Sequence, residues 1–201
     1  MLARSPQDVT RKRKVDYKPK RRKDMLWSVR RTRDLIPRGG AEVGSFALGV
    51  LVVLCLTIRQ PFAALIVAGI KKIEIRKWKP PAKLGRMLVQ AGLGTLPVPE
   101  DFRPLLRSVP PRLLAAKGEI IGVAEVRGCR ALRKEDRPDA LYDIPQTDGL
   151  FAWQIGDVWE LKSYVPIRGR QKLFPVSFDP GETELERLLL AQEGSSGSPQ
   201  T

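Results

Sequence analysis

The segment at residues 54–78 constrains the fold of this chain more than any other stretch. Apolar side chains alternate with polar or small ones from position 54 to 59, at the two-residue period of a strand with one buried face. Pro61 then ends the strand, because proline has no N–H to donate to a ladder. Proline suits the first turn of a helix, and apolar residues follow it at helical spacing. The pattern therefore predicts a helix that begins at or just after Pro61 and ends at Gly69.

A second strand is predicted directly after this helix. Ile73 and Ile75 alternate with Lys72, Glu74 and Arg76, which is the pattern of a strand whose polar face meets water. Polar side chains thus gather at the ends of three consecutive elements or along one polar edge. We expect six of them to line a common cleft: Arg59, Gln60, Lys71, Glu74, Arg76 and Trp78.

The same residues resemble the ASCH domain family. The motif RQP-aromatic-A at residues 59–63 is followed by G-x-K-x-x-E-x-R at residues 69–76 and then by Trp78. Further segments that match in order lie at residues 85–92, 120–129, 151–161 and 166–174. The resemblance covers residues 54–178, and it implies a small β-barrel related to the PUA RNA-binding fold.

The chain is accordingly predicted to be an α+β protein, a PUA-like β-barrel with flanking helices and a disordered basic N-terminal tail. We expect the tail at residues 1–45, the barrel domain at residues 46–180, and a C-terminal helix with a disordered end at residues 181–201. The remaining predicted strands are residues 87–91, 120–126, 151–155, 158–164 and 173–178, and the remaining helices are residues 102–109, 112–116 and 182–192.

The positive charge is concentrated at the N-terminus. Residues 1–38 hold 14 Lys or Arg and 4 Asp, so they carry +10 of the total of +14. This segment has no apolar period and cannot bury enough surface to offset the entropy of ordering it, so we expect disorder. Clustered cations attract the phosphate backbone of nucleic acids without sequence preference. An extension without a function and a contact with an anionic membrane surface are the alternatives.

An apolar run at residues 46–58 follows the tail and imitates a signal peptide or an anchor. Its 13 residues fall short of the roughly 20 that a bilayer-spanning helix needs. No small-residue cleavage site follows it, and the basic region before it is longer than in a usual signal peptide. We therefore expect the first barrel strand and a cytoplasmic protein without a membrane span. A membrane-associated segment is the alternative.

Histidine is absent from the chain, and cysteine occurs twice. The absence of histidine excludes a Ser-His-Asp triad, a Cys-His dyad and most zinc sites, and we expect no metal and no cofactor. Cys55 and Cys129 lie in apolar strand patterns, so each is interpreted as a small core residue in a reducing compartment. Any catalysis would have to use amine, carboxylate, hydroxyl or thiol groups.

Three tryptophans lie in or beside the predicted strands. Trp159 alternates with Leu161 and is predicted to lie in the core. Trp78 follows charged residues and precedes a proline-rich turn, so we expect it to be the more exposed. For Trp153 the family resemblance implies a position near the cleft, where a base could stack.

Two functions of different kinds are compatible with this pattern. In the first, the protein binds RNA or a modified nucleoside in the cleft. Arg59, Lys71 and Arg76 would hold phosphate, and a tryptophan would stack on the base. Gln60 and Glu74 would read the edge of the base.

In the second, the protein is an enzyme. Some small proteins of the ASCH family are amidohydrolases that act on N4-acetylcytidine, and the resemblance implies that Lys71 corresponds to their catalytic lysine. Those enzymes have a threonine three residues further on, where this chain has Glu74. A carboxylate could act as general base if burial raised its pKa. A structural ion pair between Lys71 and Glu74 is the third interpretation, and the sequence leaves the ligand and the oligomeric state open.

Overall fold

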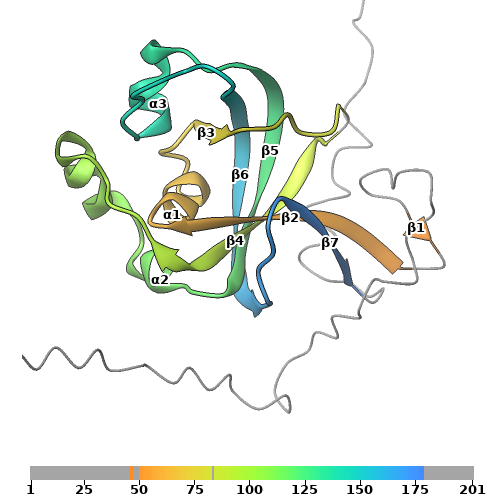
Figure 1. The fold of residues 1–201 in the computed structure, drawn as a ribbon. Coiled ribbons are helices and arrows are strands. Elements are labelled where there is room, and N and C mark those ends of the chain that lie inside the picture. Colours follow the sequence, from red (N-terminus) through yellow and green to blue (C-terminus); the bar gives the residue numbers. More distant parts are fainter. Residues whose placement is uncertain (1–45, 48–49, 83, 179–201) are drawn as a thin grey trace, which may run out of the picture.

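A mixed β-sheet that curves around one helix dominates the computed structural model, which describes residues 46–47, 50–82 and 84–178 (Figure 1). The strand order is β1 (Phe46–Ala47), β2 (Val50–Gln60), β4 (Arg86–Thr95), β5 (Glu119–Ala131), β6 (Phe151–Pro166) and β3 (Ile73–Arg76), and β7 (Leu173–Phe178) pairs with β2. The β2–β4 pair is parallel, and the other pairs are antiparallel. The protein therefore has the predicted α+β class.

Strand β2 lies at the centre of this arrangement. Leu56 and Ile58 contribute to one hydrophobic cluster, and Val53 and Cys55, which alternate with them, contribute to a second, so both faces of the strand are buried. The described part of the apolar run at residues 46–58 lies in β1 and β2. None of the helices in the described part of the chain has the length and apolar character that crossing a bilayer requires.

The sheet is open, whereas a closed barrel was predicted. β7 accompanies β2 only as far as the pair of Leu56 with Leu173, so the backbone of residues 57–60 has no strand neighbour on that side. β3 lies at the other edge of the sheet and pairs only with β6 among the described strands. Within the described ranges, no ladder joins β3 to β2 or β7.

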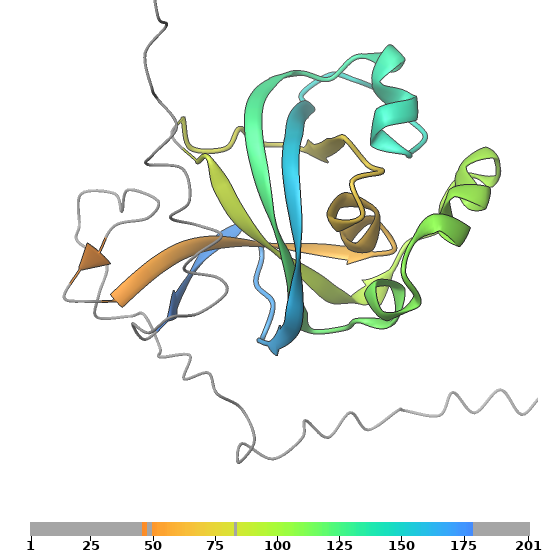
Figure 2. The same ribbon diagram turned by 180° about the vertical axis from the view of Figure 1, so that it is seen from behind.

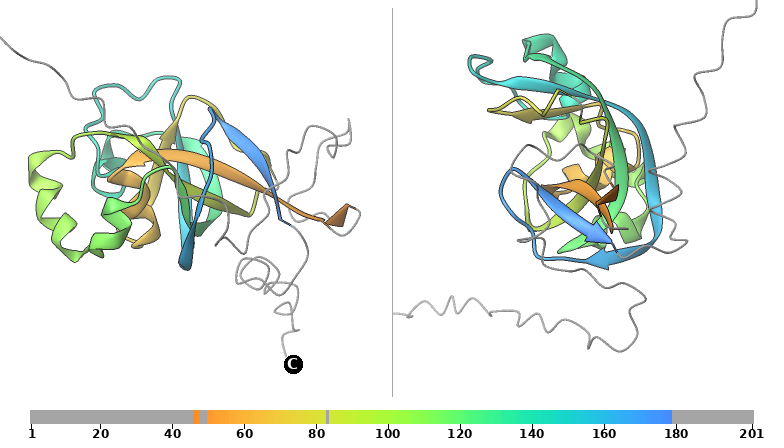
Figure 3. Two further views of the ribbon diagram at one scale, coloured as in Figure 1. Left: turned by 90° about the horizontal axis from the view of Figure 1, so that it is seen from below. Right: turned by 90° about the vertical axis from the view of Figure 1, so that its right-hand side faces the viewer.

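Helix α1 (Phe62–Val67) lies in the hollow of the curved sheet, and all six of its residues are buried (Figures 1 and 3). It begins directly after Pro61, as predicted, and ends just before Gly69, which has a φ of +72°. Helix and sheet approach closely at Gly122 of β5, where a Cβ atom would lie 2.8 Å from the Val67 side chain. The absence of a side chain at position 122 therefore lets α1 pack directly on the sheet and link β2 to β3.

Further short helices lie on the same side of the sheet as α1 (Figures 1 and 2). The β4–β5 connection contains the 3₁₀ helix η3 (Glu100–Ser108) and α2 (Pro111–Ala115), close to the two helices predicted there. The β5–β6 connection contains η4 (Lys134–Asp136) and α3 (Arg137–Ala140).

The other predicted elements agree in kind with the structure, with one difference. The strands predicted at residues 151–155 and 158–164 are a single long strand, β6. Its pairing with β5 shifts register at several points, so the alternation of buried and exposed residues is interrupted without the strand being broken. The predicted tail at residues 1–45 and the predicted helix at residues 182–192 lie outside the described residues.

Candidate functional site

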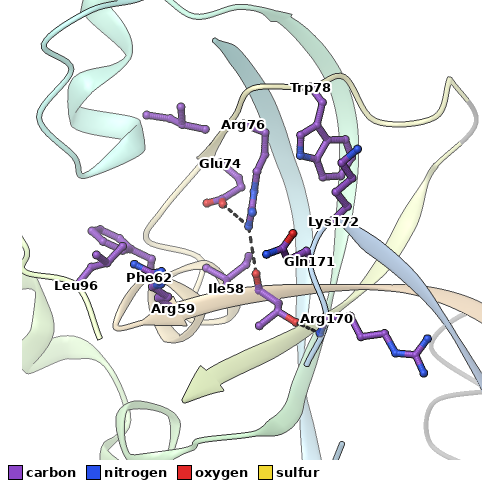
Figure 4. A pocket seen from close by; sticks show the side chains of 12 residues that line it. Ile58, Arg59, Phe62, Glu74, Arg76, Trp78, Leu96, Arg170, Gln171 and Lys172 are labelled. Atoms are coloured by element: carbon purple, nitrogen blue, oxygen red, sulfur yellow. Dashed lines mark hydrogen bonds and ion pairs between the residues drawn. The ribbon is translucent and has the colours of Figure 1, made fainter. Parts of the chain in front are cut away.

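A cavity of about 510 Å³ opens where β2 continues beyond its neighbour β7. Its walls come from the end of β2, the start of α1, strand β3 and the β6–β7 connection (Figure 4). The lining residues are Thr57, Ile58, Arg59, Phe62, Glu74, Ile75, Arg76, Trp78, Leu96, Arg170, Gln171 and Lys172. The cavity therefore occupies the opening that a closed barrel would have sealed.

Glu74 and Arg76 form the centre of the cavity. The Arg76 Nη2 atom lies 2.9 Å from Glu74 Oε1 and donates a hydrogen bond of 3.2 Å to the Thr57 carbonyl of β2. The side chain of Glu74 is only 9% exposed and that of Arg76 is 23% exposed. The polar face of β3 was expected to be wet and to line a cleft, and Glu74 and Arg76 on it line this partly enclosed cavity. The Nε atom of Arg76 is buried and has no hydrogen-bond partner in the described part of the chain.

Lys71 lies behind Glu74 and does not line the cavity. Its Nζ atom donates hydrogen bonds of 2.5 Å to the carbonyls of Ile73 and Ala140 and lies 3.7 Å from Glu74 Oε2. The residue is 3% exposed. Burial lowers the pKa of Lys71 from its ordinary value, and the nearby Glu74 carboxylate opposes that shift. Three acceptors around one amine hold Lys71 in place as part of the scaffold.

Gln60 is also part of the scaffold. It is buried, and its Nε2 atom donates to the carbonyls of Leu113, at 2.6 Å, and Ala116, at 3.0 Å. Its Oε1 atom accepts from the backbone N–H of Ala64 at 3.2 Å. These bonds join the end of β2 to α1 and to the carboxyl end of α2. The Gln60 amide is therefore outside the cavity lining, although its sequence neighbour Arg59 belongs to it.

Two of the tryptophans, Trp153 and Trp159, differ from the expectations. Trp153 is fully buried, donates from Nε1 to the Trp78 carbonyl at 3.0 Å, and packs edge-to-face on the Trp78 ring. Its ring therefore presents no free face to a base in this structure. Trp159 was predicted to lie in the core, but it is half-buried, with the Arg86 guanidinium 4.3 Å above its ring. Trp78 is half-buried and lines the cavity.

The β6–β7 connection supplies cavity residues that sequence reasoning did not single out. Arg170, Gln171 and Lys172 all line the cavity and are exposed. The Arg170 guanidinium lies 6.0 Å from the Phe174 ring and points away from the Glu74–Arg76 pair (Figure 4). The run RGRQK at residues 168–172 was the available signal, because a glycine among cations is typical of a loop that approaches an anion.

A set of polar contacts around Thr57 and Gln90 holds this connection against β2. The Thr57 hydroxyl donates to Gln90 Oε1 at 2.6 Å and accepts from the backbone N–H of Arg170 at 3.2 Å. Gln90 is fully buried, and its Nε2 atom donates to the Ile167 carbonyl at 2.6 Å. A Cβ atom at Gly169 would lie 2.7 Å from Gln90 Oε1, so the connection can approach Gln90 this closely only with glycine there.

The cavity is cationic overall. Four cationic side chains and one carboxylate line it, so the lining carries +4 − 1 = +3. In the described ranges, no group of three or more Cys, Asp or Glu side chains could hold a metal ion. Cys55 and Cys129 lie outside the lining, and burial raises the pKa of both thiols. The arrangement suits an anion that also carries hydrogen-bond donors for Glu74.

Comparisons with known proteins agree with the motif analysis. The family model described as the ASCH domain matches residues 56–163. The mouse protein named activating signal cointegrator 1 is 30% identical over 131 residues, and its human counterpart is 29% identical over 132. Each alignment covers 60% of this chain and 22% of the relative, so the chain spans about a fifth of the length of the curated relatives it matches.

A crystal structure of a mutant ASCH protein from Zymomonas mobilis, ZmASCH, was also found. It shares 17% sequence identity with this chain, with a TM-score of 0.39, and the match covers 60% of this chain and 85% of that one. The family model matches more than half of the 201 residues and includes the end of β2, helix α1 and strand β3, whereas the β6–β7 connection lies beyond the match. This protein therefore belongs to the ASCH domain family.

Proposed function

We propose that this protein binds RNA or a modified nucleoside in the cavity between β2, β3 and the β6–β7 connection. The observation that carries the proposal is the Glu74–Arg76 pair, which lies half-enclosed beside Trp78 in a cationic lining. A cavity of about 510 Å³ is within the usual size range of small-ligand sites. The relation of the ASCH family to the PUA RNA-binding fold, implied by the motifs, agrees with this proposal.

Different side chains of the cavity recognise different parts of a nucleotide. Glu74 accepts hydrogen bonds from an exocyclic amino group, and Arg76 donates to a carbonyl of the base. Trp78 offers a partly exposed ring for stacking. Arg59 and Lys172 meet phosphate, because both are exposed cations at the margin of the cavity. Gln60, Lys71 and Trp153 act on the ligand only through the residues that they support.

In the amidohydrolase alternative Lys71 is a catalytic residue. The surroundings of Lys71 do not favour that role. A general base needs a lone pair within reach of the substrate. Lys71 already donates to two carbonyls, lies beside Glu74 and is absent from the cavity lining. Its lowered pKa is the one property that favours catalysis. Binding accounts for more of the observed contacts than catalysis does.

A comparison of cytidine and uridine tests the proposal. Glu74→Gln keeps the shape of the side chain and removes its charge, so affinity for cytidine should fall by about tenfold or more, with a smaller loss for uridine. Glu135→Gln, an exposed glutamate outside the cavity, is the matched control and should change neither affinity. Isothermal titration calorimetry measures both. An equal loss for the two nucleosides would remove the role of Glu74 in reading the base.

The enzyme alternative is tested with N4-acetylcytidine. Under the binding proposal, the wild-type protein releases no acetate. Release of acetate that is lost in both Lys71→Ala and Glu74→Gln, with circular dichroism showing both variants folded, would replace the binding proposal by the amidohydrolase one. The second variant keeps the test informative should removal of Lys71 unfold the protein.

A further inference from the structure

Two of the three exposed cations of the cavity lie on different sides of the Glu74–Arg76 pair, and the third, Arg170, points away from it. Arg59, at the end of β2, lies on the side of Phe62 and Leu96, whereas Lys172 lies on the side of Trp78 (Figure 4). Neither side chain has an ion-pair or hydrogen-bond partner among the residues that the structure describes. Each is therefore a separate anion-binding group with the pair between them.

Both cations are fixed at the backbone although their side chains are exposed. Arg59 lies at an irregularity of the β2–β4 ladder, and its neighbours Ile58 and Gln60 pair with Ala91 and Thr95 of β4. Lys172 lies between Arg170, whose N–H is bonded to Thr57, and Leu173, the first residue of the β7 ladder. Its φ of +58° places it in the left-handed region, where a lysine is held only by its surroundings. Anchored backbones of this kind reduce the entropy lost on binding.

Two separated cations match one class of ligand better than the others. A nucleoside carries no phosphate, and a nucleoside monophosphate can place its one phosphate at only one of the two. A nucleotide inside a chain carries a phosphate on its 5′ side and another on its 3′ side. A base in a duplex has its pairing edge occupied, so Glu74 and Arg76 could reach it only after it had been unpaired and flipped out, at an energetic cost that a single strand does not carry.

Resting on the function proposed above, we propose that the site takes an internal nucleotide of a single-stranded nucleic acid. The base enters the cavity beside Glu74, Arg76 and Trp78. One flanking phosphate meets Arg59, and the other meets Lys172. The strand thus crosses the mouth of the cavity instead of ending in it.

The test uses the full chain and four forms of each common ribonucleoside: the nucleoside, its 5′-phosphate, its 3′-phosphate and its 3′,5′-bisphosphate. Each phosphate should tighten binding by about tenfold, so the bisphosphate should bind more tightly than either monophosphate. Arg59→Ala should abolish the gain from one of the two phosphates, and Lys172→Ala the gain from the other. Arg168→Ala, an exposed arginine of the same connection outside the lining, is the control. All variants contain the same residues 1–45, so the charge of this segment affects the affinity of every variant equally.

The test distinguishes a failure of this inference from a failure of the proposed function. A bisphosphate that binds no more tightly than the better monophosphate would overturn the inference, as would two variants that abolish the same gain. In either case the Glu74-dependent binding of nucleosides would still stand. If no nucleoside or nucleotide binds in any form, the proposed function fails and the inference fails with it.

Discussion

Gln60 illustrates how a motif residue can serve the scaffold of a site. Its amide bonds three backbone groups from α1 and from the carboxyl end of α2, and its own backbone carbonyl accepts from the N–H of Leu96. Leu96 lines the cavity, so Gln60 fixes one wall of it from behind. Lys71 holds Glu74 in a comparable way from the side of α3.

Gln60→Ala should therefore destabilise the protein. The substitution leaves the carbonyls of Leu113 and Ala116 without their buried donor and opens a small void, which costs about 2–4 kcal/mol of the free energy of unfolding. Urea denaturation measures the loss. Gln154→Ala, at an exposed position of β6, should change stability by less than about 0.5 kcal/mol. A Gln60→Ala variant as stable as this control would contradict the bracing role.

Asp136 gives a pH-dependent prediction at the same scale. The Arg130 guanidinium donates to both of its carboxylate oxygens, and the backbone N–H of Arg133 donates to one of them. The hydrogen bonds from Arg130 hold the pKa of Asp136 below its ordinary value. A depressed pKa in the folded state contributes stability above the unfolded pKa, about 3.9, and loses it as the pH falls through the folded value.

Asp136→Asn should accordingly lower the free energy of unfolding by about 1–3 kcal/mol at neutral pH. The difference from wild type should shrink as the pH falls from about 4 through the lower pKa of folded Asp136, because the unfolded wild-type chain takes up a proton there before the folded protein does. Urea titrations at a series of pH values measure it, with Asp148→Asn at an exposed position as the control. A difference that stayed constant down to pH 2 would refute the assignment.

Sequence reasoning identified several cavity residues, but it did not show which of the expected residues line the cavity and which support its walls. Alternation in β3 showed that Glu74 and Arg76 share a face, and the position of this face beside other polar element ends predicted that both line a cleft, as they do. It did not show that Gln60 and Lys71 lie outside the lining, because a polar residue at an element end suits either environment.

Alternation placed Trp159 on the same face as Leu161, and both belong to one hydrophobic cluster, but it did not show that Trp159 is only half-buried. The expectation that Trp153 could stack on a base came from the family resemblance, and the structure buries its ring. Arg170 and Lys172 were missed because they join the site through chain connectivity that no local pattern encodes.

At the scale of elements, the site depends on how the β6–β7 connection is held against β2. Thr57 is the contact point, since its hydroxyl bonds both Gln90 and the N–H of Arg170. Alternation in β2 and β4 predicted the two strands correctly, as residues 54–59 and 87–91. Their parallel pairing, which sets Thr57 opposite Gln90, could not be predicted because strand neighbours are decided by the whole fold.

Thr57→Val should loosen the connection while keeping the shape of the side chain. Without the hydroxyl, Gln90 Oε1 loses its donor and the N–H of Arg170 loses its acceptor, at a cost of about 1–2 kcal/mol. Hydrogen exchange at Arg170 should become several-fold faster, as NMR would show. Thr95→Val, at the exposed end of β4, is the matched control. Unchanged exchange at Arg170 would show that the connection is held by other contacts.

For the whole molecule, we propose that the basic N-terminal segment and the cavity make separable contributions to nucleic-acid binding. Residues 1–38 carry +10 of the net charge, and the cavity lining carries +3. Clustered cations bind phosphate without reading sequence, whereas base contacts in the cavity discriminate between ligands. Affinity and specificity should therefore respond to different parts of the chain.

Removing residues 1–45 should weaken binding to all single-stranded RNAs alike. The slope of log K against log salt should become shallower by about 0.7 for each cation of this segment that contacts phosphate. Electrophoretic mobility shifts over a range of salt concentrations measure the slope. A segment of the same length with its Lys and Arg replaced by Gln should behave like the deletion. An unchanged slope would exclude the segment from binding.

The unequal lengths of β2 and β7 also bear on self-association. A strand edge without a neighbour offers N–H and C=O groups on which an extended segment of another molecule can add. Beyond Leu56 this edge is guarded, because Arg76 donates to the Thr57 carbonyl and places a guanidinium beside it. Charged side chains at sheet edges oppose the addition of foreign strands. Arg76, which is proposed to face the ligand, is therefore also expected to oppose edge-to-edge aggregation.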